Sequence, residues 1–271
     1  MYNSLKCTLF RAYARYEAAH EGRRGNYQIA KLINAVFGLA TFTVEDFKIE
    51  LNPVAAIDRS LILGISHDDD VAQQIRAIPQ GKSFLDIGAN IGYFDLYAAA
   101  RGTPVFAFEP SPREAARLRQ NVAINNFGNL VTVFEAGISN TSEKRDLRLG
   151  KDFNPGQNSV LEVSASAEKV QCTFAPLGFY LSAEQLATVG LIKIDVEGFE
   201  YQVIEGMKEV LPSLSCPIVI EITPPFLAKA GHSATALYEL FTQAGYRPTV
   251  GLNESAKRGY DEVFVKENIG L

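Results

Sequence analysis

The stretch that decides the fold is SFLDIGANIGYFD, residues 83–95. It begins as a short apolar run, reaches an acid at Asp86, and passes through Gly88, Asn90 and Gly92 before helix-type sequence begins. In an open parallel sheet, ligands bind beyond the carboxyl ends of the strands, near the point where the strand order reverses. The glycines allow the backbone to approach a ligand closely, and Asn90 can hydrogen-bond within the turn. We therefore expect a strand, a ligand-binding turn and a helix.

A second acid, Glu109, ends the next apolar run, FAFE, 21 residues after Gly88. A carboxylate at that position can accept both hydroxyls of a ribose. Nicotinamide dinucleotide folds share this layout, but their pyrophosphate requires the pattern G-x-G-x-x-G. Here the run is G-A-N-I-G, and the acid at Asp86 suits a cationic ligand group better than a pyrophosphate. The pattern favours the sulfonium cofactor S-adenosylmethionine and leaves a NAD-dependent oxidoreductase as the alternative.

From residue 83 onward, short apolar runs alternate with helical stretches. Strands are predicted at SFLDI, PVFAFE, VTVFEA, LIKID and PIVIEI. Helices are predicted up to Ala100, from about Pro112 to Asn125, from Phe199 to Val210 and from Ala234 to Ala244. Strands separated by helices of this length form a parallel sheet covered on both faces. The last run, DEVFVKE, alternates like an edge strand, and residues 140–176 are a polar insertion that contains KDFNPGQNS.

The first 80 residues form an extension ahead of this domain, which spans residues 81–271. Two amphipathic helices are predicted from apolar residues at helical spacing, Leu5, Leu9, Tyr13 and Tyr16, then Ile29, Ile33, Val36 and Ala40. FTVEDFKIELN then alternates as a strand does and ends at Pro53. Residues 1–40 carry six bases and two acids, although the whole chain has a net charge of -5. We expect these basic helices to pack over the domain; docking of an acidic partner, a second subunit or a phosphate-bearing substrate is the alternative.

Composition excludes several classes of protein. The 271 residues are 47% hydrophobic, enough for one full core, and the acidic balance argues against nucleic acid as the main partner. The three cysteines are widely spaced, so neither a zinc site nor a disulfide framework is predicted. Arg11 and Arg15 interrupt any signal-peptide core, and the uncharged stretch 32–44 is too short to span a bilayer. We expect a cytoplasmic protein without an integral membrane segment.

Three segments in order, DIGANIGYF, FAFEPSP and LIKIDVEGFEYQVIEGM, together resemble the FkbM-type family of S-adenosylmethionine-dependent methyltransferases. The resemblance covers roughly Phe42 to the C-terminus. It implies the class I methyltransferase fold, a Rossmann-like α/β sheet of seven mostly parallel strands with helices on both faces, whose final hairpin would be YRPTV and DEVFVKE. Family members often carry Thr-Leu-Asp before the DVEG strand, whereas this chain reads TFAPLGF from Thr173. No role attached to that acid can therefore be carried over.

The resemblance also implies roles for individual residues. Asp86, Gly88 and Gly92 would line the methionine end of the cofactor, with Asn90 in the same turn, and Glu109 would hold the ribose. The residues facing adenine would be Glu135, Ala136, Gly137 and Ile138. The acceptor would be a hydroxyl on a sugar, a glycan precursor or a polyketide-type small molecule.

Methyl transfer is an in-line displacement, so the protein must align the reactants and exclude water. An alcohol nucleophile also benefits from a general base. The candidates are Asp195, which by the resemblance ends the fourth strand beside the reacting methyl group, Glu197 in the following turn, and His67 from the lead-in segment. Glu221 could also reach the pocket, and Glu197 could instead serve as helix N-terminal charge. No divalent metal is expected to be required. A non-catalytic adapter, or a homo-oligomer formed through the N-terminal helices, stays open.

Overall fold

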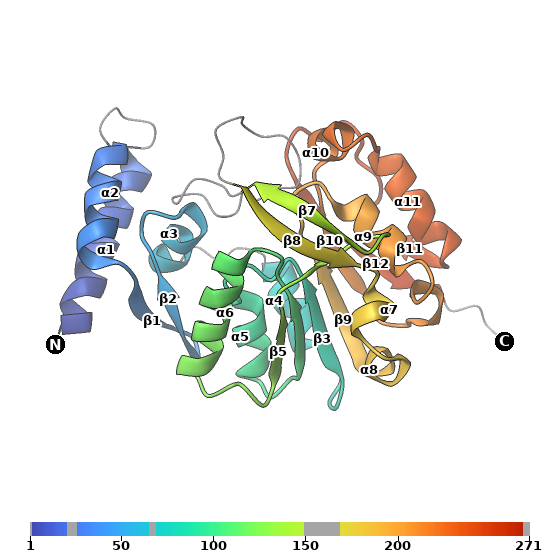
Figure 1. Cartoon of the computed structure of the whole chain (residues 1–271), viewed down its shortest axis with the longest axis horizontal. Helices are drawn as coiled ribbons and strands as arrows, with labels where there is room; N and C mark the ends of the chain where they lie inside the picture. Colours follow the sequence, from blue (N-terminus) through green and yellow to red (C-terminus); the bar gives the residue numbers. More distant parts are fainter. Residues whose placement is uncertain (1, 21–25, 65–68, 149–168, 268–271) are drawn as a thin grey trace.

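The computed structural model describes residues 2–20, 26–64, 69–148 and 169–267 of the chain (Figure 1). Within them, a seven-stranded sheet has the order β11-β12-β10-β9-β3-β4-β5. Its strands are β3 (Ser83–Ile87), β4 (Val105–Phe108), β5 (Val131–Phe134), β9 (Val189–Ile194), β10 (Ile218–Ile222), β11 (Tyr246–Pro248) and β12 (Tyr260–Lys266). Neighbouring strands pair in parallel except β12, which runs antiparallel to β10 and β11. This is the class I methyltransferase fold that the sequence predicted, including the closing hairpin.

Two strand predictions need correction. DEVFVKE is not an edge strand, because β11 covers its outer side and forms the edge itself. FTVEDFKIELN is not one strand but a hairpin of β1 (Ala40–Val44) and β2 (Phe47–Leu51). The alternation changes phase at the turn, since the apolar residues are even-numbered up to Val44 and odd-numbered from Phe47. Such a change of phase marks the point where the chain reverses, and Glu45 there has a φ of 47°.

Helices cover both faces of the sheet. They are α4 (Asp69–Arg76), α5 (Tyr93–Ala99), α6 (Pro112–Ile124), α7 (Leu177–Tyr180), α8 (Ala183–Thr188), α9 (Glu200–Met207), α10 (Pro224–Lys229) and α11 (Ala234–Gln243). Successive residues of β3 belong to two separate cores: Phe84 is part of the core that includes residues of α4, α5 and α6, whereas Leu85 is part of the core that includes residues of α7 to α11. This alternation is that of a strand buried on both faces. Helix α9 ends three residues earlier than predicted.

The N-terminal part consists of α1 (Tyr2–Ala19), α2 (Asn26–Phe37), the β1–β2 hairpin and α3 (Ala56–Leu63). Figure 1 shows α1 and α2 at one end of the molecule, opposite α11. Helix α1 packs against α3 and β1. Its buried residues are Phe10, Tyr13 and Ala14, whereas Leu5 and Tyr16 of the predicted stripe are exposed. The helix thus carries two apolar stripes, and the sequence alone did not tell which of them faces the core.

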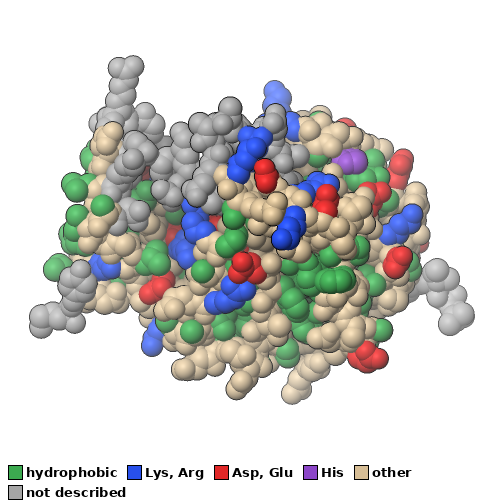
Figure 2. All heavy atoms as spheres, viewed as in Figure 1, with side chains coloured by type: hydrophobic (Ala, Val, Ile, Leu, Met, Phe, Trp, Pro, Cys, Tyr) green, Lys and Arg blue, Asp and Glu red, His purple; other side chains and the backbone are tan. Residues whose placement is uncertain are grey.

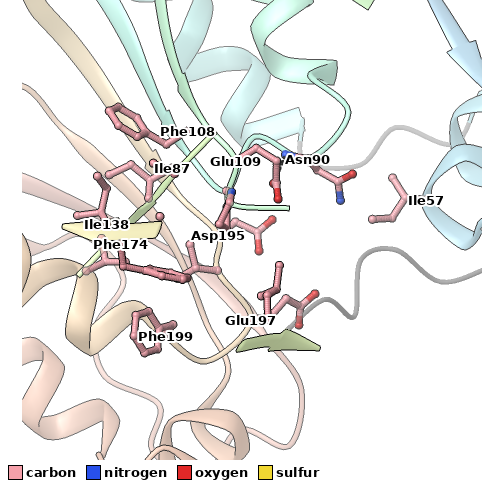
Figure 3. A pocket seen from close by; sticks show the side chains of 17 residues that line it. Ile57, Ile87, Asn90, Phe108, Glu109, Ile138, Phe174, Asp195, Glu197 and Phe199 are labelled. Carbon is pink, nitrogen blue, oxygen red and sulfur yellow. Dashed lines mark hydrogen bonds between the residues drawn. The ribbon is translucent and has the colours of Figure 1, made fainter. Parts of the chain in front are cut away.

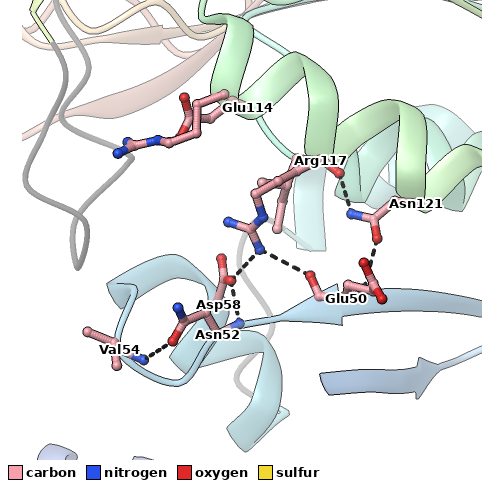
Figure 4. A network of polar contacts seen from close by, with 9 residues as sticks. Glu50, Asn52, Val54, Asp58, Glu114, Arg117 and Asn121 are labelled. Atoms are coloured by element: carbon pink, nitrogen blue, oxygen red, sulfur yellow. Dashed lines mark hydrogen bonds and ion pairs between the residues drawn. The ribbon is translucent and has the colours of Figure 1, made fainter. Parts of the chain in front are cut away.

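A buried polar network fastens β2 and α3 to helix α6 (Figure 4). Arg117 of α6 donates from Nη2 to Asp58 Oδ2 at 2.6 Å and to the backbone carbonyl of Glu50 at 3.1 Å. Asn121, one helical turn later, accepts from the Glu50 N–H and donates to the carbonyl of Ile91. Asp58 is fully buried, and burial raises its pKa while Arg117 opposes that shift. The position of α3 is therefore set by charge pairing as well as by apolar packing.

A second, three-stranded sheet has the order β6-β8-β7, with β6 (Gly137–Ile138), β7 (Glu143–Arg148) and β8 (Lys169–Ala175). Strands β7 and β8 lie within the predicted insertion 140–176, of which residues 149–168 are outside the described residues. The polar residues that the sequence singled out there, in KDFNPGQNS, lie outside the described residues, as does His67. Of the helices that are described, none has the length and apolar character needed to cross a membrane.

Candidate functional site

The turn after β3 is shaped by the close approach of two strand ends. The Asp195 N–H, just past β9, donates to the carbonyl of Ile87 at 3.0 Å. Gly88 follows with a φ of 93°, and a Cβ built on it would lie 1.8 Å from the Asp195 carbonyl oxygen. Only glycine satisfies both the backbone angle and the available space. Strand order reverses between β3 and β9, so this contact lies at the position where α/β sheets bind ligands.

The other two residues of the turn have different roles. Asn90 adopts a left-handed φ of 52°, and its N–H donates to Glu109 Oε2 at 2.9 Å. Gly92 is the N-cap of α5, with a φ of 88°, and a Cβ there would lie 2.1 Å from Leu118 Cδ1 of α6. Gly92 therefore permits helix packing. It is not among the residues that line the two cavities described below, so its role beside the methionine end of the cofactor stays a prediction.

Two backbone amides hold the carboxylate of Glu109. Besides the Asn90 N–H, the Ser111 N–H donates to Glu109 Oε1 at 2.8 Å. Burial raises the pKa of Glu109 to about 8, and the bond from Ser111 opposes the shift. Each carboxylate oxygen has a second acceptor site, so the fixed group can still receive hydrogen bonds from a ligand.

A cavity of about 100 Å³ lies beside Glu109 (Figure 3). Its apolar wall includes Ile87, Phe108, Ala136, Gly137, Ile138, Phe174 and Phe199. Figure 3 shows the side chains of Glu109, Asp195 and Glu197 reaching its interior, with aromatic rings to one side. Ala136, Gly137 and Ile138, which the resemblance assigns to the adenine side, thus line this cavity. Glu135, assigned to the same side, does not line it: its exposed carboxylate pairs with Arg119 at 2.7 Å.

A larger cavity, of about 350 Å³, continues from the first. The two share the residues Ile57, Gly88, Asn90, Asp195 and Glu197, so together they form one cleft across the carboxyl ends of β3, β4 and β9. The larger part adds Tyr93, Phe94 and Tyr260 as aromatic wall and Asp86, Lys193, Glu221 and Asp261 as charged groups. Neither Ile57 nor Phe174 could be predicted as a site residue, because apolar residues in a lead-in helix and an insertion strand carry no chemical signature of a site.

A buried lysine lies between two acids of the cleft. Lys193 Nζ is 3.3 Å from Asp195 Oδ2 and 3.7 Å from Asp86 Oδ1. Burial raises the pKa of Asp86 to about 6, although Lys193 opposes this shift. At 3.7 Å the contact is too long for a hydrogen bond. Asp86 Oδ1 is buried and has no hydrogen-bond partner among the described residues, which fits a position that a ligand donor completes.

Carboxyl groups gather where β9 and β10 end. Glu221, at the end of β10, lies within hydrogen-bonding reach of Asp195. Burial, then the neighbouring Asp195 charge, raises the pKa of Glu221 to about 9 and that of Glu197 to about 8. Glu197 also has a left-handed φ of 52°, a strained conformation that is found most often at functional sites. At neutral pH Glu221 therefore holds a proton that it can donate to Asp195.

Two further observations concern His232 and metal binding. His232 stacks on Tyr201 with ring centroids 3.8 Å apart, and it is not among the residues that line either part of the cleft. Among the residues that the structure describes, no three His, Cys, Asp or Glu side chains are grouped so that they could hold a metal ion.

Comparison with known proteins assigns the chain to a family. The profile of the Methyltransferase FkbM domain matches residues 86–248. The chain is 28% identical over 157 residues to the 31-O-demethyl-FK506 methyltransferase FkbM of Streptomyces tacrolimicus, covering 48% of this chain and 60% of that one. It is 30% identical over 137 residues to the hexuronic acid methyltransferase AglP of Haloferax volcanii, covering 49% and 53%. The match thus spans a little over half the length of each of these relatives.

A solved structure of methyltransferase FkbM from Methylobacillus flagellatus KT superposes with a TM-score of 0.45 at 17% identity, covering 68% of this chain and 43% of that chain. The profile match extends over more than half of the chain, from Asp86 at the end of β3 to Pro248 at the end of β11. It therefore contains the whole cleft apart from the N-terminal wall and the β12 side. The chain belongs to the FkbM methyltransferase family.

Proposed function

We propose that this chain is an S-adenosylmethionine-dependent O-methyltransferase that acts on a hydroxyl of a sugar, a glycan precursor or a polyketide-type small molecule. One observation carries the proposal. A single cleft at the switch point of the sheet joins an apolar slot, an acid clamped by backbone amides and a buried acid with an unfilled acceptor position. These three features match the adenine, the ribose and the cationic amino acid tail of the cofactor.

Different residues of the cleft would fit different groups of the cofactor. Asp86 Oδ1 offers a hydrogen-bond acceptor to an ammonium group. A negatively charged pyrophosphate has no donor for this acceptor and would be disfavoured beside a buried acid. The second acceptor sites of Glu109 suit a pair of ribose hydroxyls. Phe174 offers a flat aromatic face to a base, and Ile138 adds an aliphatic contact. This combination supports S-adenosylmethionine over a nicotinamide dinucleotide.

Bound there, the cofactor supplies a methyl group activated by the positive sulfonium. The chain's own residues would align the acceptor and keep water out, which can provide much of the rate. Asp195 would take the proton from the acceptor hydroxyl as general base. Lys193 fixes one carboxylate oxygen of Asp195, and protonated Glu221 can hydrogen-bond to the same side chain. Lys193 and Glu221 therefore orient the base.

The larger cavity would hold the amino acid tail of the cofactor at Asp86 and the acceptor in its remaining space. Its aromatic side chains, Tyr93 and Phe94 among them, offer flat surfaces that suit a sugar or another ring, and its carboxyl groups accept hydrogen bonds from hydroxyls. The relatives' names support a hydroxyl-bearing acceptor, since one is described for 31-O-demethyl-FK506 and the other for hexuronic acid.

Isothermal titration of the purified chain with S-adenosylmethionine, S-adenosylhomocysteine, NADH and NADPH tests the proposal. We expect micromolar binding of the first two and none of the nicotinamide cofactors. Binding of a nicotinamide cofactor alone would make the chain an oxidoreductase. Binding of none would favour the non-catalytic adapter.

A further inference from the structure

Exposed apolar side chains are concentrated on the two N-terminal helices. Of the nine large apolar side chains exposed among the described residues, six lie on α1 and α2: Leu5, Leu9, Tyr16, Ile29, Leu32 and Val36. Figure 2 shows apolar side chains gathered along the outer edge of the molecule where Figure 1 has these helices. Apolar side chains exposed together on one pair of helices indicate an interaction site, because single exposed apolar residues are usually scattered. We name these six residues the docking face.

The docking face is distinct from the face that holds the helices on the domain. On α1, Phe10 and Tyr13 are buried, whereas Leu5, which is 62% exposed, points away from that contact. On α2, Ile33 packs against the domain, whereas Leu32 is 64% exposed. Each helix therefore has an inner apolar stripe that is already packed and an outer one that is not. Folding of this chain accounts only for the inner stripes.

Charge indicates which partner covers the outer stripes. Residues 1–40 contain six bases and two acids, while the rest of the chain carries the acidic surplus. Arg11 and Arg15 of α1 are both exposed. A second copy would bring two basic surfaces together, which costs free energy, whereas an anionic surface would be attracted. Amphipathic helices with an apolar stripe and basic residues on the polar face typically bind in the plane of a membrane interface.

We propose that the docking face binds the surface of an anionic lipid bilayer, with α1 and α2 lying in the plane of the interface. Leucine, isoleucine and valine side chains would enter the headgroup region, and the basic side chains would contact lipid phosphates. This inference concerns a different surface from the cleft and does not depend on the cofactor.

Helix α3 connects the docking face to the cleft. It packs against α1, and its residues Ile57 and Leu61 line the larger cavity. If α1 and α2 bind the bilayer, α3, which packs against α1, brings part of the cleft wall near the lipid surface. Membrane binding would place the cleft close to molecules held at the lipid surface.

Vesicle flotation of the full chain tests the proposal. We expect binding to vesicles of phosphatidylcholine with about 30% phosphatidylglycerol, at least about tenfold weaker binding to phosphatidylcholine alone, and release at high salt. Equal binding to both kinds of vesicle, or to neither, would overturn the assignment.

Matched variants identify the surface. The double substitution Leu5→Ser with Leu32→Ser should lower the partition coefficient by about tenfold or more, because two half-exposed leucines lose their transfer into the interface. The control, Phe179→Ser with Val250→Ser, removes apolar side chains that are 72% and 83% exposed elsewhere, and it should bind like the wild type. Equal loss in both pairs would contradict the proposal. Light scattering provides a second test. If the wild type formed a dimer and only the leucine variant lost it, the partner would be a second copy, and the proposal would be contradicted.

Discussion

Replacing Gly88 by alanine should destabilise the chain more than the same change at any glycine in open space. The added Cβ would lie 1.8 Å from the Asp195 carbonyl oxygen, below the 3.0 Å that real Cβ contacts respect. The ends of β3 and β9 must then separate by more than an ångström at the point where the cleft forms. Gly102 provides the control, because its φ of 79° is similar but nothing lies within 4 Å of its Cβ position.

The magnitude follows from two contributions. A left-handed φ costs a residue with a Cβ about 1–2 kcal/mol, and Gly102→Ala should show that cost alone. Overpacking adds about 1–3 kcal/mol, so Gly88→Ala should lose about 2–5 kcal/mol of unfolding free energy. In a chain of this size that corresponds to a Tm lower by about 5–15 °C.

Urea and thermal unfolding of both variants measure the difference, and calorimetry with S-adenosylhomocysteine reports on the cleft. We expect Gly88→Ala to be the less stable variant and to bind the ligand more weakly than Gly102→Ala does. If the two variants had equal stability and equal affinity, the close approach of β3 and β9 would not exist as described, and the account of the turn would be refuted.

Three further predictions concern the buried charges. Burial raises the pKa of Glu221 from 4.5 to about 9. Between these pH values Glu221 stays protonated in the folded chain but loses its proton in the unfolded chain, so the free energy of unfolding falls as the pH rises. The glutamine of Glu221→Gln does not titrate, so the unfolding free energy of the variant minus that of the wild type should rise by up to about 1.4 kcal/mol per pH unit between pH 5 and pH 8. A difference in urea unfolding that stays constant with pH would contradict this. Asp195→Asn should lower methyl transfer to a panel of sugar and polyketide acceptors by about a hundredfold or more while cofactor affinity changes little, and wild-type turnover would remove Asp195 as the base. Arg117→Met leaves Asp58 buried without its cation and should cost about 3–5 kcal/mol in unfolding free energy; a loss below about 1 kcal/mol would mean that the network of Figure 4 is not holding the extension.

Residues at the ends of parallel strands were predictable, because their placement follows from the strand pattern alone. Asp86, Gly88, Glu109 and Asp195 each end or follow an apolar run, and the carboxyl ends of parallel strands meet at one edge of a sheet. The final hairpin was expected only from the family resemblance, because the strand pattern by itself had indicated that DEVFVKE is an edge strand.

Side-chain direction beyond a strand end was not predictable. Glu135 follows β5 just as Glu109 follows β4, yet it turns outward and pairs with Arg119 on α6. Helix α1 shows the same limit: its two apolar stripes both have helical spacing, and only packing against α3 and β1 decides that the Phe10 stripe is buried. These outcomes depend on contacts between segments far apart in the chain, which periodicity does not encode.

The central claim, that the cleft binds the cofactor through Glu109, is tested most directly by a matched pair of variants. Calorimetric titration with S-adenosylhomocysteine should give an affinity about ten- to a hundredfold weaker for Glu109→Ala, the scale of a lost charged hydrogen bond. Glu135→Ala, whose carboxylate faces solvent, should bind as the wild type does, and both variants should still show cooperative unfolding. Wild-type affinity in both would contradict the placement of the cofactor in this cleft.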